Sequence, residues 1–369
     1  NIDDEIYILG NPPYLGTRNQ DKVQKQEMKN VFHSIKKSGK LDYISCWFLL
    51  ASNYIINTKN KYVFVSTNSI CQGEQVPILW PLILGDELEI QFAYPPFNWS
   101  NNAKGGAGVT VVIIGVGVKN NSPKSLYLEN NLKNSVKHIN PYLAGAPTIY
   151  VNSKTKPINY LPEMVRGNYT GCCNALILTS EEKEKLIKNE PSSVKFIRPF
   201  VGSSEFIKND FRYCLWISDN LLNEAKQIPE ISERIDKVRE ERLKSTDKGQ
   251  NNIADRSHQF REFNETTIQS VIVPVVSSQR RNYIPTGFIS PGTIVPNSAQ
   301  IIYDCETWVF GVVSSRIHMS WVSTVAGRLR GDYRYSSSIC YNVFPFPEVN
   351  QKQKEQINLH VFEVLEERE

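Results

Sequence analysis

The residues with the clearest chemical potential are Asn11-Pro12-Pro13-Tyr14. Two consecutive prolines restrict the backbone and remove two N–H donors, which leaves the Pro12 carbonyl and the Asn11 side-chain oxygen as converging acceptors. An exocyclic amino group offers two matching donors. Holding both hydrogens draws the nitrogen lone pair out of conjugation and directs it toward a methyl sulfonium, while Tyr14 offers an aromatic face to a base extruded from a duplex. The pattern predicts methyl transfer to an exocyclic amine; the alternative is a plain Asn-Pro turn.

A second set of candidate residues lies in Tyr94–Trp99 (YPPFNW). We expect Phe97 or Trp99 to close the other face of the extruded base. The alternative is an aromatic loop that packs on a second domain. The polar run Ser66–Ser69 is predicted to follow a strand end, where it either lines the same pocket or forms an ordinary capped turn.

The elements that must position these residues alternate between strand and helix. The apolar run Glu5–Leu9, ended by Gly10 and the prolines, predicts a buried strand. Further strands are predicted at 62–66, 88–94 and 109–118, helices at 41–58 and 74–84, and a loop with some helix at 17–40.

This alternation indicates an α/β, doubly wound parallel sheet. The segment between 94 and 109 is rich in Pro, Asn and Gly and has no helical period, so the last two strands are predicted to be antiparallel neighbours. Ligands of such sheets bind beyond the carboxyl ends of the strands, where both motifs are expected.

The pattern changes beyond about residue 120. A charged helix is predicted at 229–249, short strands at 271–276 and 300–303, and a surface helix at 351–369. With 369 residues, two domains are expected. We predict a first domain at 1–122, an α+β domain at 123–347 and a C-terminal helix at 348–369.

The composition is that of an ordinary globular protein. Hydrophobic residues make up 40%, and no apolar run approaches the roughly 18 residues of a membrane helix, so no membrane association is expected. The seven cysteines are scattered, which predicts reduced thiols in a cytoplasmic protein. The five histidines show no zinc-ligand spacing, so no metal is expected. The first residue is Asn and no signal peptide follows, which suggests an excised segment.

Taken together, these motifs resemble the methyltransferase and target-recognition portion of single-chain type II restriction-modification enzymes. Such enzymes join a nuclease, a gamma-class adenine-N6 methyltransferase and a specificity domain. The matching segments are YILGNPPYLG, KLDYISCWFLLASNYI, VFVSTNSICQGEQVPILWPLI, PPFNWSNNAKG, VTVVIIG, INPYL, GSSEFI, RYCLWISD, RRNYIP and GRLRGDYRYSSSICYNVFPFP.

The resemblance implies a fold, a reaction and a set of partners. The first domain would be the C-terminal half of a Rossmann-like, class I S-adenosylmethionine-dependent methyltransferase sheet, followed by an α+β target-recognition domain. The whole protein would flip an adenine out of a specific double-stranded DNA site and methylate its N6 atom, in a prokaryotic cytoplasm.

The same resemblance assigns residues. Asn11, Pro12, Pro13 and Tyr14 would form the catalytic loop, and Phe97 with Trp99 would stack with Tyr14 on the target base. The proposed DNA-contacting residues are Arg280, Arg281, Arg328, Arg330 and Arg334, the last three beside Tyr333 and Tyr335. The alternative for these arginines is that they are solvated or paired with Asp332.

The sequence also departs from the family pattern. No glycine-rich cofactor loop precedes Asn11, so the main cofactor-binding residues are unknown and only Asn11 lies at the edge of that pocket. Gly115-Val116-Gly117 is predicted to be a strand end, and Gly105, Gly106 and Gly108 a hairpin loop. The E-x-K spacing of Glu181–Lys183 falls in a charged helix and indicates no nuclease. We expect a missing N-terminal part of the polypeptide to supply the cofactor half and possibly a nuclease, and the isolated chain to be inactive.

Three alternatives stay open. Asn-Pro-Pro-Tyr also suits a methyltransferase that acts on a protein glutamine or on RNA. The chain alone could be a non-catalytic, sequence-specific DNA-binding module. A permuted methylase is disfavoured because no suitable glycine-rich loop follows residue 200.

Overall fold

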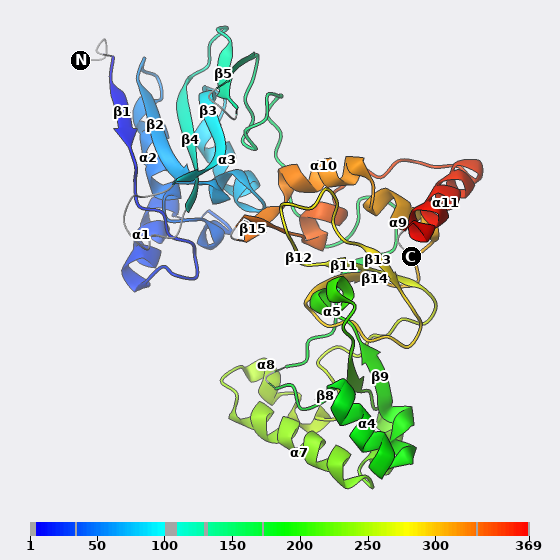
Figure 1. Ribbon diagram of the computed structural model, residues 1–369. Coiled ribbons are helices and arrows are strands. Elements are labelled where there is room, and N and C mark those ends of the chain that lie inside the picture. The colour runs from blue at the N-terminus through cyan, green and yellow to red at the C-terminus, as the bar shows by residue number, and fades with distance from the viewer. Residues whose placement is uncertain are drawn as a thin grey trace. The chain divides into compact units, whose positions relative to one another are not determined.

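The computed structural model describes residues 5–33, 35–99, 109–128, 132–171, 173–329 and 331–367. The chain divides into two compact units (Figure 1). Unit 1 comprises Asn1–Lys154 and Val322–Asp332, and unit 2 comprises Thr155–Trp321 and Tyr333–Glu369. The predicted domain boundary after residue 122 therefore lies inside unit 1, which also includes a short segment from late in the sequence.

Unit 1 is built on a six-stranded mixed sheet with the order β1-β2-β4-β3-β5-β6. Its strands are β1 (Tyr7–Gly10), β2 (Lys61–Thr67), β3 (Leu88–Trp99), β4 (Val109–Val118), β5 (Lys124–Tyr127) and β6 (Lys133–Val136). β1 is parallel to β2, and β4 is antiparallel to both β2 and β3, so β1, β2 and β3 run in one direction. The predicted antiparallel pair is confirmed. The predicted sheet was incomplete, because β5 and β6 extend it beyond β3.

The helices of unit 1 are α1 (Lys22–Phe32), α2 (Ser45–Ile55) and α3 (Gln75–Leu84), with short 3-10 turns at η1 (Ser38–Lys40) and η2 (Asn68–Cys71). α1 begins at a capping box formed by Asp21 and Gln24. The three helices and the sheet share one hydrophobic core. Its centre is aromatic: Phe48 of α2 packs edge-on against Tyr62, Phe64 and Trp80.

Two strands are less buried than the sequence predicted. β1 was expected to be buried, but Tyr7 and Leu9 are 56% and 73% exposed. The reason is its position, since β1 is the end strand of the sheet and pairs with β2 among the described residues. β2 was also expected to be buried throughout, yet only alternate residues such as Tyr62 and Phe64 are. The described helices therefore pack on one face of β2.

The β3–β4 hairpin differs from its prediction in length. β3 does not end at Tyr94 but continues through the aromatic segment to Trp99, with irregularities in register before Phe92 and Phe97. Gly115 and Gly117 lie inside β4, as predicted. A Cβ at Gly115 would come within 2.3 Å of the Phe92 ring on the neighbouring strand, so glycine is required there by packing. Gly105, Gly106 and Gly108 lie outside the described residues.

Unit 2 contains two antiparallel sheets, β8-β10-β9 and β13-β11-β14-β7, each with its own core. The strands are β7 (Met164–Arg166), β8 (Ile177–Leu178), β9 (Ile197–Phe200), β10 (Arg212–Leu215), β11 (Ser270–Pro274), β13 (Gly287–Ile289) and β14 (Ala299–Ile302). Two short strands, β12 (Val276–Ser277) and β16 (Asp332–Arg334), pair through Val276 and Arg334, and β15 (Gly327–Leu329) lies in the segment that belongs to unit 1.

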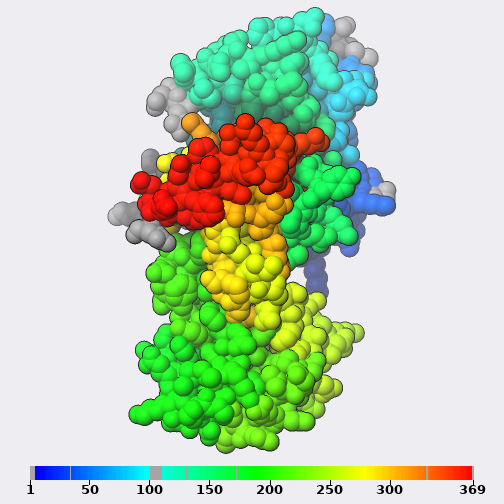
Figure 2. All heavy atoms as spheres, turned by 90° about the vertical axis from the view of Figure 1, so that its right-hand side faces the viewer, coloured from blue at the N-terminus to red at the C-terminus, as the bar shows by residue number. Residues whose placement is uncertain are grey.

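The longer helices after residue 154 are α4 (Ser180–Asn189), α7 (Pro229–Lys244), α9 (Thr307–Val313), α10 (Arg316–Val325) and α11 (Gln351–Glu366). The shorter ones are η4 (Pro191–Phe196), α5 (Ser203–Lys208), η5 (Asp219–Leu221), α6 (Leu222–Ala225), α8 (Lys248–Asn251), η6 (Ala254–Arg256) and η7 (Ser337–Tyr341). The predicted charged helix is α7, and the predicted surface helix is α11, which is drawn in red in Figure 2. Glu182 lies in α4 and caps it, as well as pairing with Arg234 of α7.

Candidate functional site

The Asn11–Tyr14 loop follows the carboxyl end of β1, as predicted. Asn11 and Pro13 are exposed, Pro12 is buried, and Tyr14 is half-buried with its ring packed on the core of unit 1. Because β1, β2 and β3 run in one direction, the loop after β1, the turn after β2 and the end of β3 share one edge of the sheet. Asn11 is therefore accessible to a ligand at this edge, while Pro12 beside it is buried.

Leu15, the residue after Tyr14, fixes the loop through both of its backbone groups. Its N–H donates to Oδ1 of Asp42 over 2.8 Å. Its carbonyl accepts from Nε2 of Gln20 at 2.9 Å and from the backbone N–H of Tyr43 at 3.1 Å. Leu15 is the first residue after the two prolines and Tyr14, so these bonds hold the end of the loop against the start of α2.

Asp42 connects this loop to the turn after β2. Its Oδ1 also accepts from the N–H of Ile44 at 3.3 Å, and its Oδ2 from the Ser69 hydroxyl at 3.4 Å. The side chain is buried, and burial raises the pKa of the Asp42 carboxyl, an effect that its hydrogen bonds oppose. In the same turn, Thr67 caps η2, so the polar run after β2 serves local structure and contacts Asp42.

The aromatic residues expected to complete the site lie on β3. Phe97 is half-buried and Trp99 is 41% exposed, with their ring centroids 6.2 Å apart. β2 and β4 stand between β1 and β3, which at about 4.8 Å per strand separates the two strand ends by about 14 Å. The structure thus places Tyr14 and this pair on one edge but on separate strands, and their joint stacking on one base stays a prediction.

The proposed DNA-contacting arginines fall into two groups. Arg334 is exposed on β16 opposite Val276, and the exposed Arg280 and Arg281 follow β12 in the chain, so all three belong to unit 2. Arg328 belongs to unit 1, where its guanidinium donates to the Ser323 carbonyl at 3.0 Å. Arg330 lies outside the described residues. The DNA-binding role of these residues stays a prediction.

The tyrosines beside these arginines do not face solvent. Tyr333 is 9% and Tyr335 is 1% exposed, and the hydroxyl of Tyr335 lies 2.8 Å from Nε2 of the buried His318. Burial lowers the pKa of His318 to about 3, so this histidine is neutral at ordinary pH. Tyr333 and Tyr335, which lie beside the proposed DNA-contacting arginines in the sequence, are therefore packed inside the protein.

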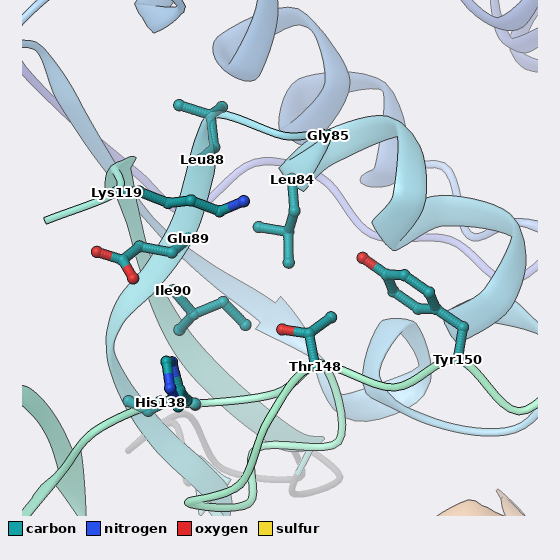
Figure 3. A pocket seen from close by; sticks show the side chains of 10 residues that line it. Leu84, Gly85, Leu88, Glu89, Ile90, Lys119, His138, Thr148 and Tyr150 are labelled. Atoms are coloured by element: carbon teal, nitrogen blue, oxygen red, sulfur yellow. The ribbon is translucent and has the colours of Figure 1, made fainter.

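A cavity of about 220 Å³ lies elsewhere in unit 1 (Figure 3). It opens at the amino end of β3, where Glu89, Lys119 and His138 meet Thr148 and Tyr150. The Asn11–Tyr14 loop lies at the opposite end of the strands, so this cavity is separate from the candidate site.

Within the described part of the chain, no helix is long and apolar enough to cross a membrane. No cluster of three or more His, Cys, Asp or Glu side chains there has an arrangement suited to a metal ion.

The sequence analysis did not identify Asp42 and Gln20, the two side chains that hydrogen-bond to Leu15 at the end of the Asn11–Tyr14 loop. One signal was available for Asp42, since an aspartate just before an amphipathic stripe is a typical helix-start residue. No local pattern identifies Gln20, because its partners, the carbonyls of Leu15 and Leu41, are brought to it by folding.

Comparison with known proteins identifies the two parts of the chain. Residues 1–128 match the model of the MmeI DNA-methyltransferase domain, and residues 145–348 match that of the MmeI target recognition domain. The chain belongs to the MmeI family. Its α/β portion is therefore a methyltransferase domain, followed by a recognition domain, as the sequence motifs predicted.

Two relatives of the MmeI family are similar over nearly the whole chain. DNA methyltransferase A of Bacillus subtilis (strain 168) is 43% identical over 366 residues, which cover 99% of this chain and 42% of that protein. The type IIL restriction-modification enzyme MmeI, solved in complex with DNA, aligns with a TM-score of 0.89 and 39% identity, over 98% of this chain and 49% of that one. The chain thus spans less than half the length of both relatives.

Proposed function

We propose that this chain is the catalytic-loop and target-recognition portion of a DNA methyltransferase that modifies the N6 atom of adenine at a specific double-stranded site. The observation that carries the proposal is the Asn11–Tyr14 loop, held at the carboxyl end of β1 with Asn11 exposed. The family membership supports the reaction class, and the names of the two relatives, a DNA methyltransferase and a restriction-modification enzyme bound to DNA, support DNA as the substrate.

The chemistry of the loop fits an exocyclic amine. The Asn11 side-chain oxygen and the Pro12 carbonyl each accept a hydrogen bond from the amino group. The half-buried Tyr14 supplies one stacking face. The half-buried Phe97 and the exposed Trp99, at the same edge of the sheet, supply the second aromatic surface. The residues need no strong base, because hydrogen bonding of the amine raises the availability of its lone pair.

S-adenosylmethionine is the cofactor that suits this loop, since its methyl sulfonium supplies the electrophilic carbon. The residues in this chain that fit it are few. Asn11 is exposed after the end of β1, where a bound cofactor would meet the target amine, and the β4 glycines Gly115 and Gly117 pack against Phe92 and Gln91 of β3. The main cofactor-binding surface is therefore proposed to come from another part of the same polypeptide.

We expect the part of the polypeptide that supplies the cofactor-binding surface to pack along the edge of β1. Three large apolar residues are exposed here: Ile6, just before β1, at 38%, and Tyr7 and Leu9, on this end strand of the sheet, at 56% and 73%. An exposed, apolar strand edge favours pairing with a further strand. A preceding segment that adds strands beside β1 would cover these residues and complete the sheet around the catalytic loop.

The proposal is tested by labelled methyl transfer to duplex DNA. A polypeptide extended upstream to include the cofactor half should label adenine, while the 369-residue chain alone should not. The Asn11→Ala variant of the extended protein should lose at least about 100-fold in rate, because it lacks one of the two acceptors. Label found only on cytosine, RNA or protein glutamine, or full activity of Asn11→Ala, would refute the proposal.

A further inference from the structure

The Asn11–Tyr14 loop has little bonding of its own that could fix its position. Pro12 and Pro13 have no N–H groups, so the amide of Leu15 is the donor that follows Tyr14 in the chain. That amide is bonded to Asp42, and the Leu15 carbonyl to Gln20 and Tyr43. The exact position of Tyr14 relative to a bound base therefore depends on a side chain that lies 27 residues away in the sequence.

The Asp42 carboxylate joins three separate segments of unit 1. Its two oxygens accept from Leu15 of the catalytic loop, Ile44 at the start of α2 and Ser69 of the turn after β2. Its own backbone N–H donates to Oε1 of Gln75, at the start of α3, over 2.9 Å. The loops that follow β1 and β2 are thereby tied to one group at the edge of the sheet where the reaction is proposed.

A carboxylate suits this position better than the neutral side chains that usually begin helices. An ionised carboxylate only accepts, so both oxygens serve donors at once, whereas an asparagine presents an NH₂ group in place of one oxygen. Burial of the charge is costly, since Asp42 is 5% exposed. Its bonds to Leu15, Ile44 and Ser69 offset that cost only while all three segments keep this arrangement.

We propose that Asp42 is a positioning residue for methyl transfer, acting through the Leu15 amide to hold Asn11, Pro12 and Tyr14 in the geometry that grips the target amine. This inference rests on the proposed function. It assigns Asp42 no contact with the substrate. Loss of its acceptor oxygens leaves the loop attached to the core through Tyr14 but free to shift, and displacements of about 1 Å at a reacting centre cost about 100-fold in rate.

The test uses the upstream-extended polypeptide and the variant Asp42→Asn. We expect the single-turnover rate constant for methyl transfer at saturating DNA to fall about 10–100-fold. The dissociation constant for duplex DNA should change by less than about twofold, because the variant removes an interaction that matters in the transition state and not in binding. A merely structural role would instead lower the thermal unfolding midpoint and weaken both quantities together.

The matched control is Asp304→Asn. The Asp304 carboxylate has the same pattern of partners, two backbone N–H groups (Thr267 and Ile268) and one hydroxyl (Thr267), but it lies in unit 2. This variant should transfer methyl groups at the wild-type rate. Equal rates for Asp42→Asn and wild type, or equal losses in Asp42→Asn and Asp304→Asn, would overturn the inference.

A second variant keeps the test decisive if Asp42→Asn does not fold. Gln20→Ala removes the uncharged amide that donates a hydrogen bond to the Leu15 carbonyl. It should also slow methyl transfer, with little change in DNA affinity. A wild-type rate for Gln20→Ala would overturn the inference in that case. Absence of methyl transfer by the wild-type protein would refute the proposed function itself, an outcome distinct from failure of the Asp42 comparison.

Discussion

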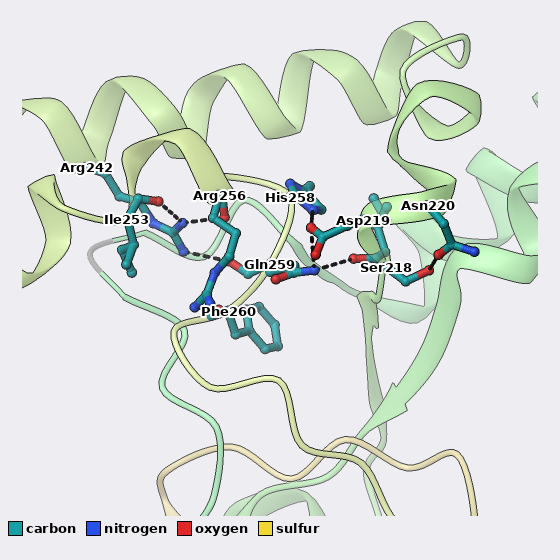
Figure 4. A network of polar contacts seen from close by, with 10 residues as sticks. Ser218, Asp219, Asn220, Arg242, Ile253, Arg256, His258, Gln259 and Phe260 are labelled. Atoms are coloured by element: carbon teal, nitrogen blue, oxygen red, sulfur yellow. Dashed lines mark hydrogen bonds and ion pairs between the residues drawn. The ribbon is translucent and has the colours of Figure 1, made fainter.

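Replacing Arg242 with methionine removes the central group of a buried network in unit 2 (Figure 4). The Arg242 side chain is fully buried near the end of α7. Its guanidinium donates to the backbone carbonyls of Ile253, Arg256 and Gln259 over 2.9, 2.7 and 2.7 Å. These carbonyls belong to the irregular segment after α8, which has little regular hydrogen bonding of its own.

The expected loss of stability follows from these bonds. Three hydrogen bonds from a charged donor, at about 1.5–3 kcal/mol each, give about 5–9 kcal/mol in total. The net loss of unfolding free energy is smaller than this total, because methionine does not bury a charge and because water hydrates some of the carbonyls that lose their donor. Breaking a buried hydrogen-bond network is one of the few changes that reach or exceed about 4 kcal/mol, and our estimate for Arg242→Met is about 3–5 kcal/mol.

Urea unfolding of the chain measures this loss, with tryptophan fluorescence as the signal, because Trp216 packs against Phe260 at the end of the same segment. Amide hydrogen exchange of residues 253–260 reports the local effect. The control is Arg239→Met on the same helix, whose side chain is 55% exposed and makes a 3.4 Å surface ion pair with Asp255. It should lose less than about 1 kcal/mol. If Arg242→Met lost no more than this control, the network would not be what holds the segment.

Three further predictions concern other parts of the chain. His318 has its pKa lowered to about 3 by burial, so it binds a proton in the unfolded chain below pH 6.5 but not in the folded one. The contribution of His318 to the unfolding free energy is therefore fully present above pH 6.5, and it falls by about 1.4 kcal/mol per pH unit below that value. Between pH 7 and pH 5, the unfolding free energy of His318→Gln, measured by urea titration, should fall by about 2 kcal/mol less than that of the wild type. Lys124 is buried against Glu89 at 2.6 Å, so Lys124→Met should lower the unfolding free energy by about 3 kcal/mol, whereas Lys119→Met, at an exposed site, should change it little. Replacement of Arg280 and Arg281 by alanine should reduce the slope of log affinity for DNA against log salt by about 2; an unchanged slope would contradict their phosphate role.

The sequence predicted the elements whose pattern is local. α2, α3 and β4 show clear apolar periodicity, and their bounds are close to those predicted. The strands β5 and β6, with sequences KSLY and KNSV, have no such pattern, because they form by pairing along the edge of β3. The length of β3 was underestimated for a related reason: prolines predict a strand end, but here the register irregularities accommodate them.

The position of the candidate loop could be predicted from the sequence, but the side chains that hold it could not. Gly10 and the two prolines after a short apolar run predict that a strand ends there, and the structure places Asn11–Tyr14 directly after β1. The hydrogen bonds of the Asp42 carboxylate join three segments that come together only in the folded chain. The burial of Tyr335 against His318 depends on the packing of α10, which sequence patterns do not report.

The segment Val322–Asp332 affects how recognition domains can be exchanged between relatives. By sequence it falls within the recognition-domain match at 145–348, but in space it belongs to unit 1, where the Val325 carbonyl accepts from the N–H of Gly73 at 3.1 Å. Gly73 lies against the backbone of Gly327 and has a φ of +54°, which residues with a side chain rarely adopt, so substitution of Gly73 would strain this contact. A chimaera joined at residues 145 and 348 would replace one side of the contact with foreign sequence. A chimaera that keeps the host residues 322–332 would retain both sides, and is the better design for transferring a new DNA specificity.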